Sequence, residues 1–301
     1  MTLGFDGKLF LLAFDHRGSF QETFFGVEGE PTPEQAASIA DAKAVIYEGV
    51  LSALQGGAPR EGAGVLVDEQ FGADVARAAK GEGLLLAMPV ERSGQAEFDF
   101  EYGEEFGEHI ERFDPSFSKV LVRYNPEGDA SMNERQAERL RRLGAWLHER
   151  GRRYLFELLV PAEAHQLASV EGDAARFDVE VRPGLVVRAI GELQRAGVEP
   201  DIWKLEGLER REDCIAVAEA ATTGGRHGVV CVVLGRGADR DAVDRWLRAA
   251  SGVPGYAGFA IGRSIWWDPL RAFVDGEEGR DEVAARIGSH YRRFIDVSEG
   301  G

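Results

Sequence analysis

The sequence predicts one closed barrel of eight parallel strands, each followed by a helix, in a single domain over residues 1–301. Three observations lead to this prediction. Short apolar runs alternate with longer amphipathic segments along the whole chain, and no shift in composition divides it. The apolar runs are nearly continuous, which is typical of strands that helices cover on both faces. A chain of 301 residues also has the usual length for such a barrel.

Eight apolar runs give the expected strands, at residues 8–15, 64–67, 84–88, 119–124, 154–159, 202–205, 229–234 and 257–261. The expected helices lie at residues 33–55, 71–80, 103–113, 133–150, 186–196, 212–221, 242–250 and 282–297. Each helical segment is longer than the strand before it and places apolar residues three or four apart. The polar, acidic stretch 91–102 is expected to form a loop.

Turn and capping residues set the ends of several of these elements. Thr32-Pro33 suits the N-cap and first turn of the first helix. Pro89, Asn125-Pro126 and Pro161 end the third, fourth and fifth strands, because proline cannot donate to a strand ladder. Gly197 ends the helix of residues 186–196.

An open doubly wound sheet is the structural alternative. It would carry a glycine-rich phosphate-binding turn directly after its first strand. The residues at that point, Asp15-His16-Arg17-Gly18, do not form such a turn. The closed barrel therefore remains the preferred prediction.

Composition limits the partners and the compartment. The formal charge is −17, from 35 Lys and Arg against 52 Asp and Glu, so neither nucleic acid nor an anionic membrane surface is an expected partner. Cys214 and Cys231 give no disulfide framework, which suits a reducing compartment. Residues 1–15 carry no signal-peptide pattern, and no run of 18 apolar residues occurs. We expect a cytoplasmic protein that binds a small molecule, with a homo-oligomer left open.

One lysine stands out. Only five of the 35 basic residues are lysine, and Lys204 lies in the middle of the sixth expected strand. Lysine can lose its proton and attack a carbonyl, whereas arginine cannot. From this run alone, Lys204 could equally extend into solvent from a strand end. The residues at the other strand ends must therefore distinguish a catalytic lysine from an exposed one.

In a barrel, catalytic groups lie at the carboxyl ends of the strands. Alternation of side chains places Lys119 and Arg123 on one strand face, and Lys204 and Glu206 on another. If these faces point inward, lysines and carboxylates meet in one apolar-walled space, where imine formation is the chemistry they fit. Lys119 would act as a second cation that activates Lys204, and Glu157 and Asp15 would transfer protons.

The last two strand ends predict a phosphate site. They carry glycines and arginines, Gly235-Arg236-Gly237 and Gly262-Arg263, where barrels commonly bind phosphate with exposed backbone amides. The combined set predicts an aldolase, a carbon–carbon lyase, acting on a phosphorylated ketose. It needs no cofactor and no metal.

Five segments carry a resemblance to a known family. Residues 12–17, 66–71, 119–124, 203–206 and 258–266 are similar to the class I aldolases of the tagatose-bisphosphate and sulfofructose-phosphate type. Over nearly the whole chain, the sequence most resembles the aldolase-like domain of unknown function that is fused to the 5-dehydro-2-deoxygluconokinase of myo-inositol catabolism. The chain shows no kinase segment, so kinase activity is not expected.

The resemblance implies roles for individual residues. Lys204 would be the Schiff-base lysine, Glu157 the proton shuttle, and Asp15 and Lys119 their partners. Gly235, Gly262 and Arg263 would contact phosphate. The chain departs from the related enzymes at His16, where they usually have glutamine, and at Gly207, where several have proline.

The inositol-pathway resemblance also implies a substrate. It would be 2-deoxy-5-keto-gluconate 6-phosphate, cleaved to dihydroxyacetone phosphate and malonate semialdehyde. Arg123 is the expected ligand of the substrate carboxylate. Arg17, Glu206, Arg236 and Gly237 complete the expected substrate-binding set.

Other functions remain open at this point. The chain could act on a tagatose bisphosphate or a sulfofructose phosphate. A metal-dependent class II aldolase could use Asp68, Glu157 and Glu206 as magnesium ligands, and EDTA sensitivity would reveal it. A barrel that binds a sugar phosphate without catalysis is the third alternative. A histidine zinc site is not expected, because only His16 lies at a strand end.

Overall fold

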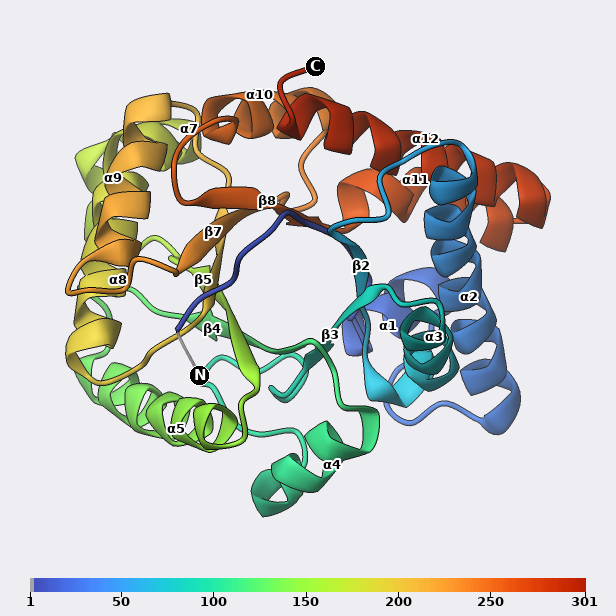
Figure 1. Ribbon diagram of the computed structural model, residues 1–301, viewed down its shortest axis with the longest axis horizontal. Helices are drawn as coiled ribbons and strands as arrows, with labels where there is room; N and C mark the ends of the chain where they lie inside the picture. The colour runs from blue at the N-terminus through green and yellow to red at the C-terminus, as the bar shows by residue number, and fades with distance from the viewer. Residues whose placement is uncertain (1–2) are drawn as a thin grey trace.

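Eight strands pair in chain order around a closed ring in the computed structural model, which describes residues 3–301 (Figure 1). All neighbouring pairs are parallel, including β8 with β1. The strands are β1 Leu9–Ala13, β2 Ala63–Leu66, β3 Leu85–Pro89, β4 Phe117–Arg123, β5 Arg153–Leu159, β6 Ile202–Glu206, β7 Val230–Leu234 and β8 Tyr256–Ile261. The predicted (β/α)8 barrel is confirmed, and the open doubly wound sheet is wrong.

Helices form the outer layer of the barrel (Figure 1). They are α1 Gly18–Phe25, α2 Pro33–Gln55, α3 Glu69–Gly81, the 3-10 turn η1 Gly103–Glu105, α4 Phe106–Phe113, α5 Ala130–Glu149, α6 Ala164–Ser169, α7 Ala174–Arg176, the π-helical η2 Phe177–Val181, α8 Arg182–Arg195, α9 Arg211–Thr222, α10 Arg240–Ala250, α11 Arg263–Val274 and α12 Arg280–Ser298. Each predicted helix is present. The sequence analysis missed α1, α6, α7, η2 and α11; α11 contains Pro269, which normally argues against a helix.

Along the barrel axis, the side chains that fill the interior change from apolar to charged. Apolar side chains fill its lower part, among them Leu11, Leu155, Ile202 and Val232. A second, larger apolar cluster fills the space between the barrel and its helices. Since inward-facing residues alternate along a strand, Lys204 lies two residues beyond Ile202 on the same face. The apolar floor therefore carries a charged layer at the carboxyl ends of the strands.

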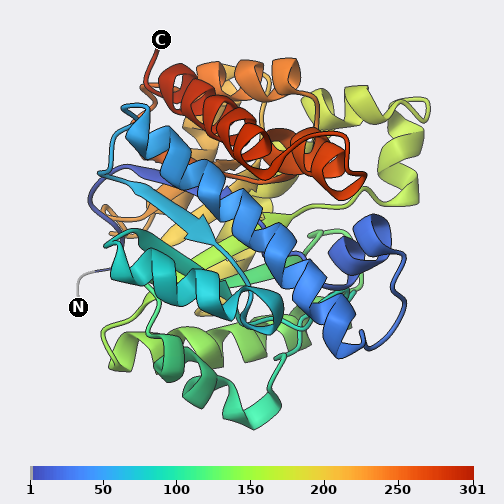
Figure 2. The ribbon, with the colours of Figure 1, turned by 90° about the vertical axis from the view of Figure 1, so that its right-hand side faces the viewer.

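Two helices far apart in the sequence lie side by side on the outside of the barrel. Figures 1 and 2 show α2 along α12, which brings the two ends of the chain's helical layer together. The contact is close because glycines meet there. A Cβ atom on Gly288 would lie 2.8 Å from the Gly49 carbonyl oxygen and 3.0 Å from the Ala53 backbone nitrogen.

The substitution Gly288→Ala is expected to lower the free energy of unfolding by about 1–3 kcal/mol, because the new methyl group meets backbone atoms that cannot move aside. Gly184→Ala in α8 is the matched control. Its Cβ would meet nothing within 4 Å, so the better helix propensity of alanine should raise stability by up to about 1 kcal/mol. Urea denaturation measures both changes, and equal effects at the two glycines would contradict the close α2–α12 contact.

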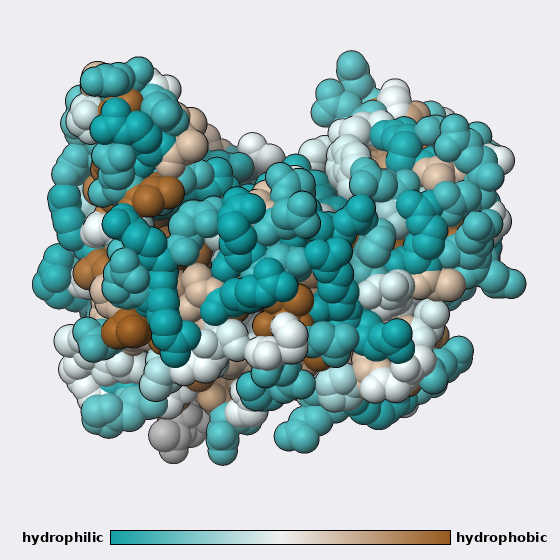
Figure 3. Space-filling model, turned by 90° about the horizontal axis from the view of Figure 1, so that it is seen from above, coloured by the Kyte–Doolittle hydropathy of each residue, from teal (hydrophilic) through white to brown (hydrophobic). Residues whose placement is uncertain are grey.

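The outer surface is predominantly hydrophilic. Figure 3 shows polar residues over most of one face, with apolar residues scattered singly. Ile215 is the one large apolar side chain in residues 3–301 that counts as exposed. Across the same residues, every helix is too short or too polar to cross a membrane.

Candidate active site

A cavity of about 480 Å³ opens at the carboxyl ends of the strands. Residues from seven of the eight strands or from the loops after them supply its charged groups. It brings together all of the predicted site residues except Gly235: Asp15, Arg17, Lys119, Arg123, Glu157, Lys204, Glu206, Arg236, Gly237, Gly262 and Arg263. The strand-end rule thus located one real concave site.

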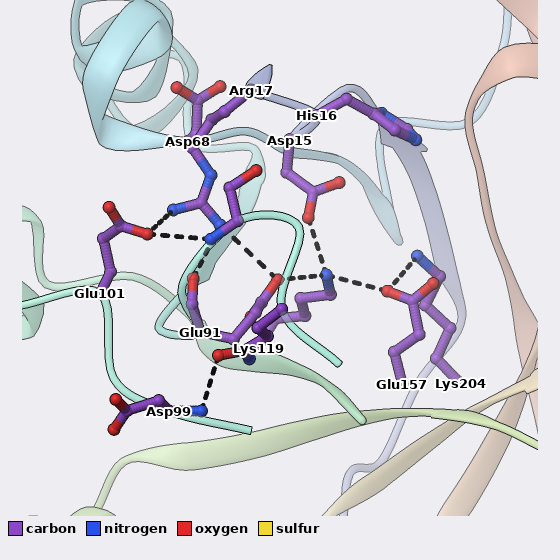
Figure 4. Close-up of polar contacts among 12 residues, drawn as sticks. Asp15, His16, Arg17, Asp68, Glu91, Asp99, Glu101, Lys119, Glu157 and Lys204 are labelled. Atoms are coloured by element: carbon purple, nitrogen blue, oxygen red, sulfur yellow. Dashed lines mark hydrogen bonds and ion pairs between the residues drawn. The ribbon is translucent and has the colours of Figure 1, made fainter. Parts of the chain in front are cut away.

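Lys204 lies at the centre of this site, beside a carboxylate. Its Nζ is 3.0 Å from Oε2 of Glu157, its partner across the β5–β6 pair. The same oxygen lies 2.9 Å from Nζ of Lys119 (Figure 4). Lys204 is 2% exposed and Lys119 1% exposed, so both amines are desolvated and paired with one buried carboxylate.

Lys119 lies among three carboxylates. Its Nζ is 2.8 Å from Oδ2 of Asp15 and 2.8 Å from Oε1 of Glu91, in addition to Glu157. Burial alone would lower the pKa of Lys119, but these carboxylates raise it well above its ordinary value. Burial opposes ionisation of Asp15 as well, yet Lys119 and Lys204 lower its pKa. The sequence predicts Lys119 as a second cation that activates Lys204, whereas in the structure three carboxylates surround its amine and offset its charge.

Glu91 is a charged site residue that the sequence analysis missed, and Gln95 of the same loop was missed as well. Glu91 follows β3 directly, in the stretch expected to be a loop, and 5% of it is exposed. Its Oε2 is buried and has no hydrogen-bond partner. Burial raises the pKa of Glu91, and Lys119 and Arg17 only partly oppose this. The strand-end rule would have found it, since it lies two residues after Pro89.

A buried ion pair fixes the backbone on both sides of Asp15. Lys43 of α2 is fully buried; its Nζ pairs with Asp68 and donates to the carbonyl oxygens of Phe14 and His16, each at 2.9 Å. Asp68 also accepts from the Phe71 backbone nitrogen at 2.8 Å as the N-cap of α3. Lys43 therefore positions the loop after β1.

Asp68 does not line the cavity, because its carboxylate is engaged by Lys43 and by α3. The alternative magnesium site of Asp68, Glu157 and Glu206 is therefore not assembled. In residues 3–301, no three His, Cys, Asp or Glu side chains are placed to share a metal ion.

His16 lines the cavity next to Asp15. Its Nδ1 is buried without a hydrogen-bond partner, and its ring meets the edge of Trp266 at 5.8 Å between centroids. Burial lowers the pKa of His16 from 6.5 to about 4, although Asp15 acts in the opposite direction. The imidazole is therefore neutral at neutral pH.

This shift predicts a specific loss of stability in acid. Between pH 6.5 and about 4, the unfolded chain binds a proton at His16 that the folded chain does not, so the free energy of unfolding falls as the pH drops. We expect His16 to contribute about 1–3 kcal/mol of this loss. Urea denaturation of wild type and His16→Gln at pH 7 and pH 4.5 measures the difference. The exposed His165 gives the control His165→Gln, and equal pH dependence of wild type and His16→Gln would contradict the shift.

The loops after β7 and β8 meet at the opposite side of the cavity from β4. Arg236 and Gly237 adopt left-handed backbone conformations, with φ of 54° and 74°. Nη2 of Arg263 donates to the Arg236 carbonyl oxygen at 3.1 Å. Gly262 lets the end of β8 lie close to the end of β1, because a Cβ there would lie 2.2 Å from the Ala13 carbonyl oxygen. Gly235 lies behind this surface rather than on it.

Several predicted substrate-binding groups have protein partners. Nη1 of Arg236 lies 2.6 Å from Asp178, and its Nε lies 3.5 Å from Glu206. Arg17 pairs with Glu101 at 2.9 Å and donates to the Glu91 carbonyl oxygen at 2.7 Å, with both contacts drawn in Figure 4. These two arginines therefore link neighbouring segments of the chain at the mouth of the cavity.

Glu206 is nearly buried and faces Arg182 as well as Arg236. It accepts from the Val160 backbone nitrogen at 3.0 Å, and Nε of Arg182 lies 3.5 Å away. Burial raises its pKa, and the two arginines oppose this. Glu206 thus joins β6 to the loops after β5 and β7.

Two cavity arginines keep free charge. Within residues 3–301, Arg123 and Arg263 line the cavity and form no ion pair, whereas Arg17, Arg92 and Arg236 do. Arg123 ends β4 and Arg263 follows β8, and these strands face each other across an eight-stranded ring. Lys204 lies on β6, halfway between them along the ring.

A protein-family model matches residues 5–299 of this chain, and its family is described as uncharacterized proteins conserved in bacteria, DUF2090. That match covers nearly the whole barrel. The chain belongs to the DUF2090 family. No curated protein matches its sequence.

Solved structures similar to this DUF2090 barrel include fructose-bisphosphate aldolases. The Plasmodium falciparum enzyme has a TM-score of 0.71 at 11% identity, over 98% of this chain and 91% of that one. An archaeal enzyme, solved with its catalytic lysine bound to a carbinolamine intermediate, has a TM-score of 0.60 at 14% identity, over 98% and 95%. The Slackia heliotrinireducens enzyme has a TM-score of 0.57 at 16% identity, over 94% and 86%. At these identities the similarity shows the fold of the DUF2090 chain.

Proposed function

We propose that this protein is a class I aldolase, in which Lys204 forms an imine with the ketone of a phosphorylated keto sugar or sugar acid. One observation carries the proposal: a desolvated lysine amine lies in the cavity 3.0 Å from a buried carboxylate. Such an amine can be deprotonated by its neighbour and attack a carbonyl. The similar solved structures include a Schiff-base-forming aldolase and one with its catalytic lysine bound to a carbinolamine intermediate, which supports the same chemistry.

The first step joins Lys204 to the substrate. Glu157 accepts a proton from Nζ, and the free amine attacks the ketone carbon to give a carbinolamine. Glu157 then returns the proton to the carbinolamine hydroxyl, which leaves as water, and an iminium remains. Lys119 keeps Glu157 oriented, because it contacts the same oxygen at 2.9 Å.

The second step breaks a carbon–carbon bond. Asp15, whose lowered pKa makes it a carboxylate, removes the proton of the hydroxyl β to the iminium. The hydroxyl carbon becomes an aldehyde, and the electrons of the broken bond pass into the iminium to give an enamine. After the aldehyde leaves, the same proton is returned to the enamine carbon. Water then hydrolyses the iminium and releases the phosphorylated ketone and Lys204.

The phosphate of the substrate binds at the β7 and β8 loops. Arg263, which forms no ion pair within residues 3–301, supplies a cation there, and the cavity-lining Gly237 and Gly262 have no side chain of their own to keep phosphate oxygens from the backbone. The proposed substrate is 2-deoxy-5-keto-gluconate 6-phosphate, giving dihydroxyacetone phosphate and malonate semialdehyde. Tagatose bisphosphate and sulfofructose phosphate are the alternative substrates to compare.

Cleavage of 2-deoxy-5-keto-gluconate 6-phosphate, measured by the dihydroxyacetone phosphate released, tests this proposal. We expect turnover that EDTA does not change, and a higher kcat/KM than for tagatose 1,6-bisphosphate or sulfofructose 1-phosphate. Faster cleavage of either alternative would identify that compound as the substrate and would leave the proposed imine mechanism unchanged. Activity that EDTA abolishes and magnesium restores would contradict the imine mechanism.

A further inference from the structure

A short hairpin, residues 91–100, covers the β4 side of the cavity. Glu91 and Phe100 form an antiparallel bridge, and the Arg92 backbone nitrogen donates to the Asp99 carbonyl oxygen at 2.9 Å. We call this segment the 91–100 hairpin. Four of its residues besides Glu91 line the cavity: Arg92, Ser93, Gly94 and Gln95.

The 91–100 hairpin is tied to the end of β4 by a buried side chain. Gln136 of α5 is fully buried; its Oε1 accepts from the Phe98 backbone nitrogen at 2.8 Å. Its Nε2 donates to the Arg123 carbonyl oxygen at 3.1 Å. The hairpin and Arg123 are therefore held in one fixed arrangement.

Within residues 3–301, the side-chain amide of Gln95 has a hydrogen-bond partner at its oxygen but none at its nitrogen. Its Oε1 accepts from the Asp99 backbone nitrogen at 2.7 Å, which fixes the orientation of the amide. Its Nε2 is buried and has no hydrogen-bond partner. A buried amide donor without a partner is costly, so this group is suited to an acceptor that enters the cavity.

Arg123 lies directly beside Gln95. Its Nη1 donates to the Gln95 carbonyl oxygen at 2.7 Å, and it forms no ion pair within the described part of the chain. The neighbouring cavity wall is apolar, formed by Leu121 and Leu159. Apolar walls strengthen the attraction between the guanidinium and an anion.

We propose that Arg123 and Gln95 form a carboxylate subsite, which selects aldehydes that carry a carboxylate. This inference rests on the proposed aldolase function and assigns its aldehyde specificity. The guanidinium provides the charge, and the Gln95 amide provides a second directed donor. The subsite lies across the ring from Arg263, so the substrate would span the cavity with its ketone near Lys204.

Aldol condensation assays with two aldehydes test the carboxylate subsite independently of imine formation at Lys204. Dihydroxyacetone phosphate is combined either with malonate semialdehyde or with propanal, which has a methyl group in place of the carboxylate. The variants are Arg123→Met and Gln95→Glu. The second keeps an acceptor for the Asp99 nitrogen but replaces the amide donor by a carboxylate oxygen.

We expect wild type to prefer malonate semialdehyde. Each variant should lose roughly 10- to 100-fold in kcat/KM for malonate semialdehyde, the range for removing a hydrogen bond to a charged group. Its kcat/KM for propanal should stay within about threefold. Arg77→Met removes an equal charge from the exposed Arg77–Asp74 pair and should change neither value.

Two results would overturn the subsite: no preference of wild type for malonate semialdehyde, or equal losses with both aldehydes in the variants. Borohydride trapping of dihydroxyacetone phosphate on Lys204 is measured in every variant, because this ketone has no carboxylate. Trapping in wild type without carboxylate selectivity overturns the subsite alone. Absence of trapping in wild type overturns the aldolase proposal itself. If Gln95→Glu fails to fold, Gln95→Leu tests the same donor.

Discussion

Lys204→Met is expected to reduce kcat/KM for aldol cleavage by about 10⁴-fold or more, since it removes the amine that forms the proposed covalent intermediate. Methionine matches the length of the lysine stem and suits a buried strand position. Glu157 keeps its ion pair with Lys119, so the substitution leaves no carboxylate without a cation. The loss should therefore be in chemistry and not in folding.

Three comparisons make this result decisive. Lys204→Arg keeps a charge next to Glu157 but cannot form an imine, so it should be as inactive as Lys204→Met. Lys80→Met, at an exposed lysine, should keep wild-type activity. Thermal unfolding of each variant checks the fold. More than a tenth of wild-type turnover in Lys204→Met would contradict the role of this lysine.

Lys43→Met is expected to lower the free energy of unfolding by about 3–5 kcal/mol, because it leaves the fully buried Asp68 carboxylate without its cation. That is a large part of the 5–15 kcal/mol typical of folded proteins. The carbonyl oxygens of Phe14 and His16 also lose their donor, so the loop that carries Asp15 should shift. A fall in kcat should accompany the loss of stability.

The chain offers a matched control for this pair. Lys80 and Asp114 also form a lysine–aspartate bridge between neighbouring elements, but both side chains are about half exposed. Lys80→Met should therefore cost less than about 1 kcal/mol. The double variant Lys43→Met/Asp68→Asn should recover part of the stability, since asparagine is neutral and still caps α3. Equal urea midpoints for Lys43→Met and Lys80→Met would show that the buried pair is not needed.

The sequence was sufficient to predict the barrel, and the site residues it predicted line one cavity, apart from Gly235. Parallel strands covered on both faces must be apolar, and this pattern is readable residue by residue. The alternation along β4 and β6 placed Lys119 and Lys204 on inward faces, as observed. Helix α11 was missed because Pro269 lies within it, and α1 because it has only eight residues.

Ion pairs between distant segments could not be predicted. Arg17 and Glu101 are 84 residues apart, and Arg236 and Asp178 are 58 residues apart. Loop packing determines which arginine forms an ion pair and which does not. The sequence analysis therefore assigned all of them to substrate binding. The structure separates them: among the residues it describes, Arg123 and Arg263 line the cavity without forming an ion pair.

The most direct test of the account is borohydride reduction in the presence of dihydroxyacetone phosphate, followed by mass spectrometry of the peptide that contains residue 204. The imine mechanism predicts a reduced adduct of the triose phosphate on Lys204, which is absent in Lys204→Met. No adduct in the wild type, or an adduct on Lys119 instead, would contradict it.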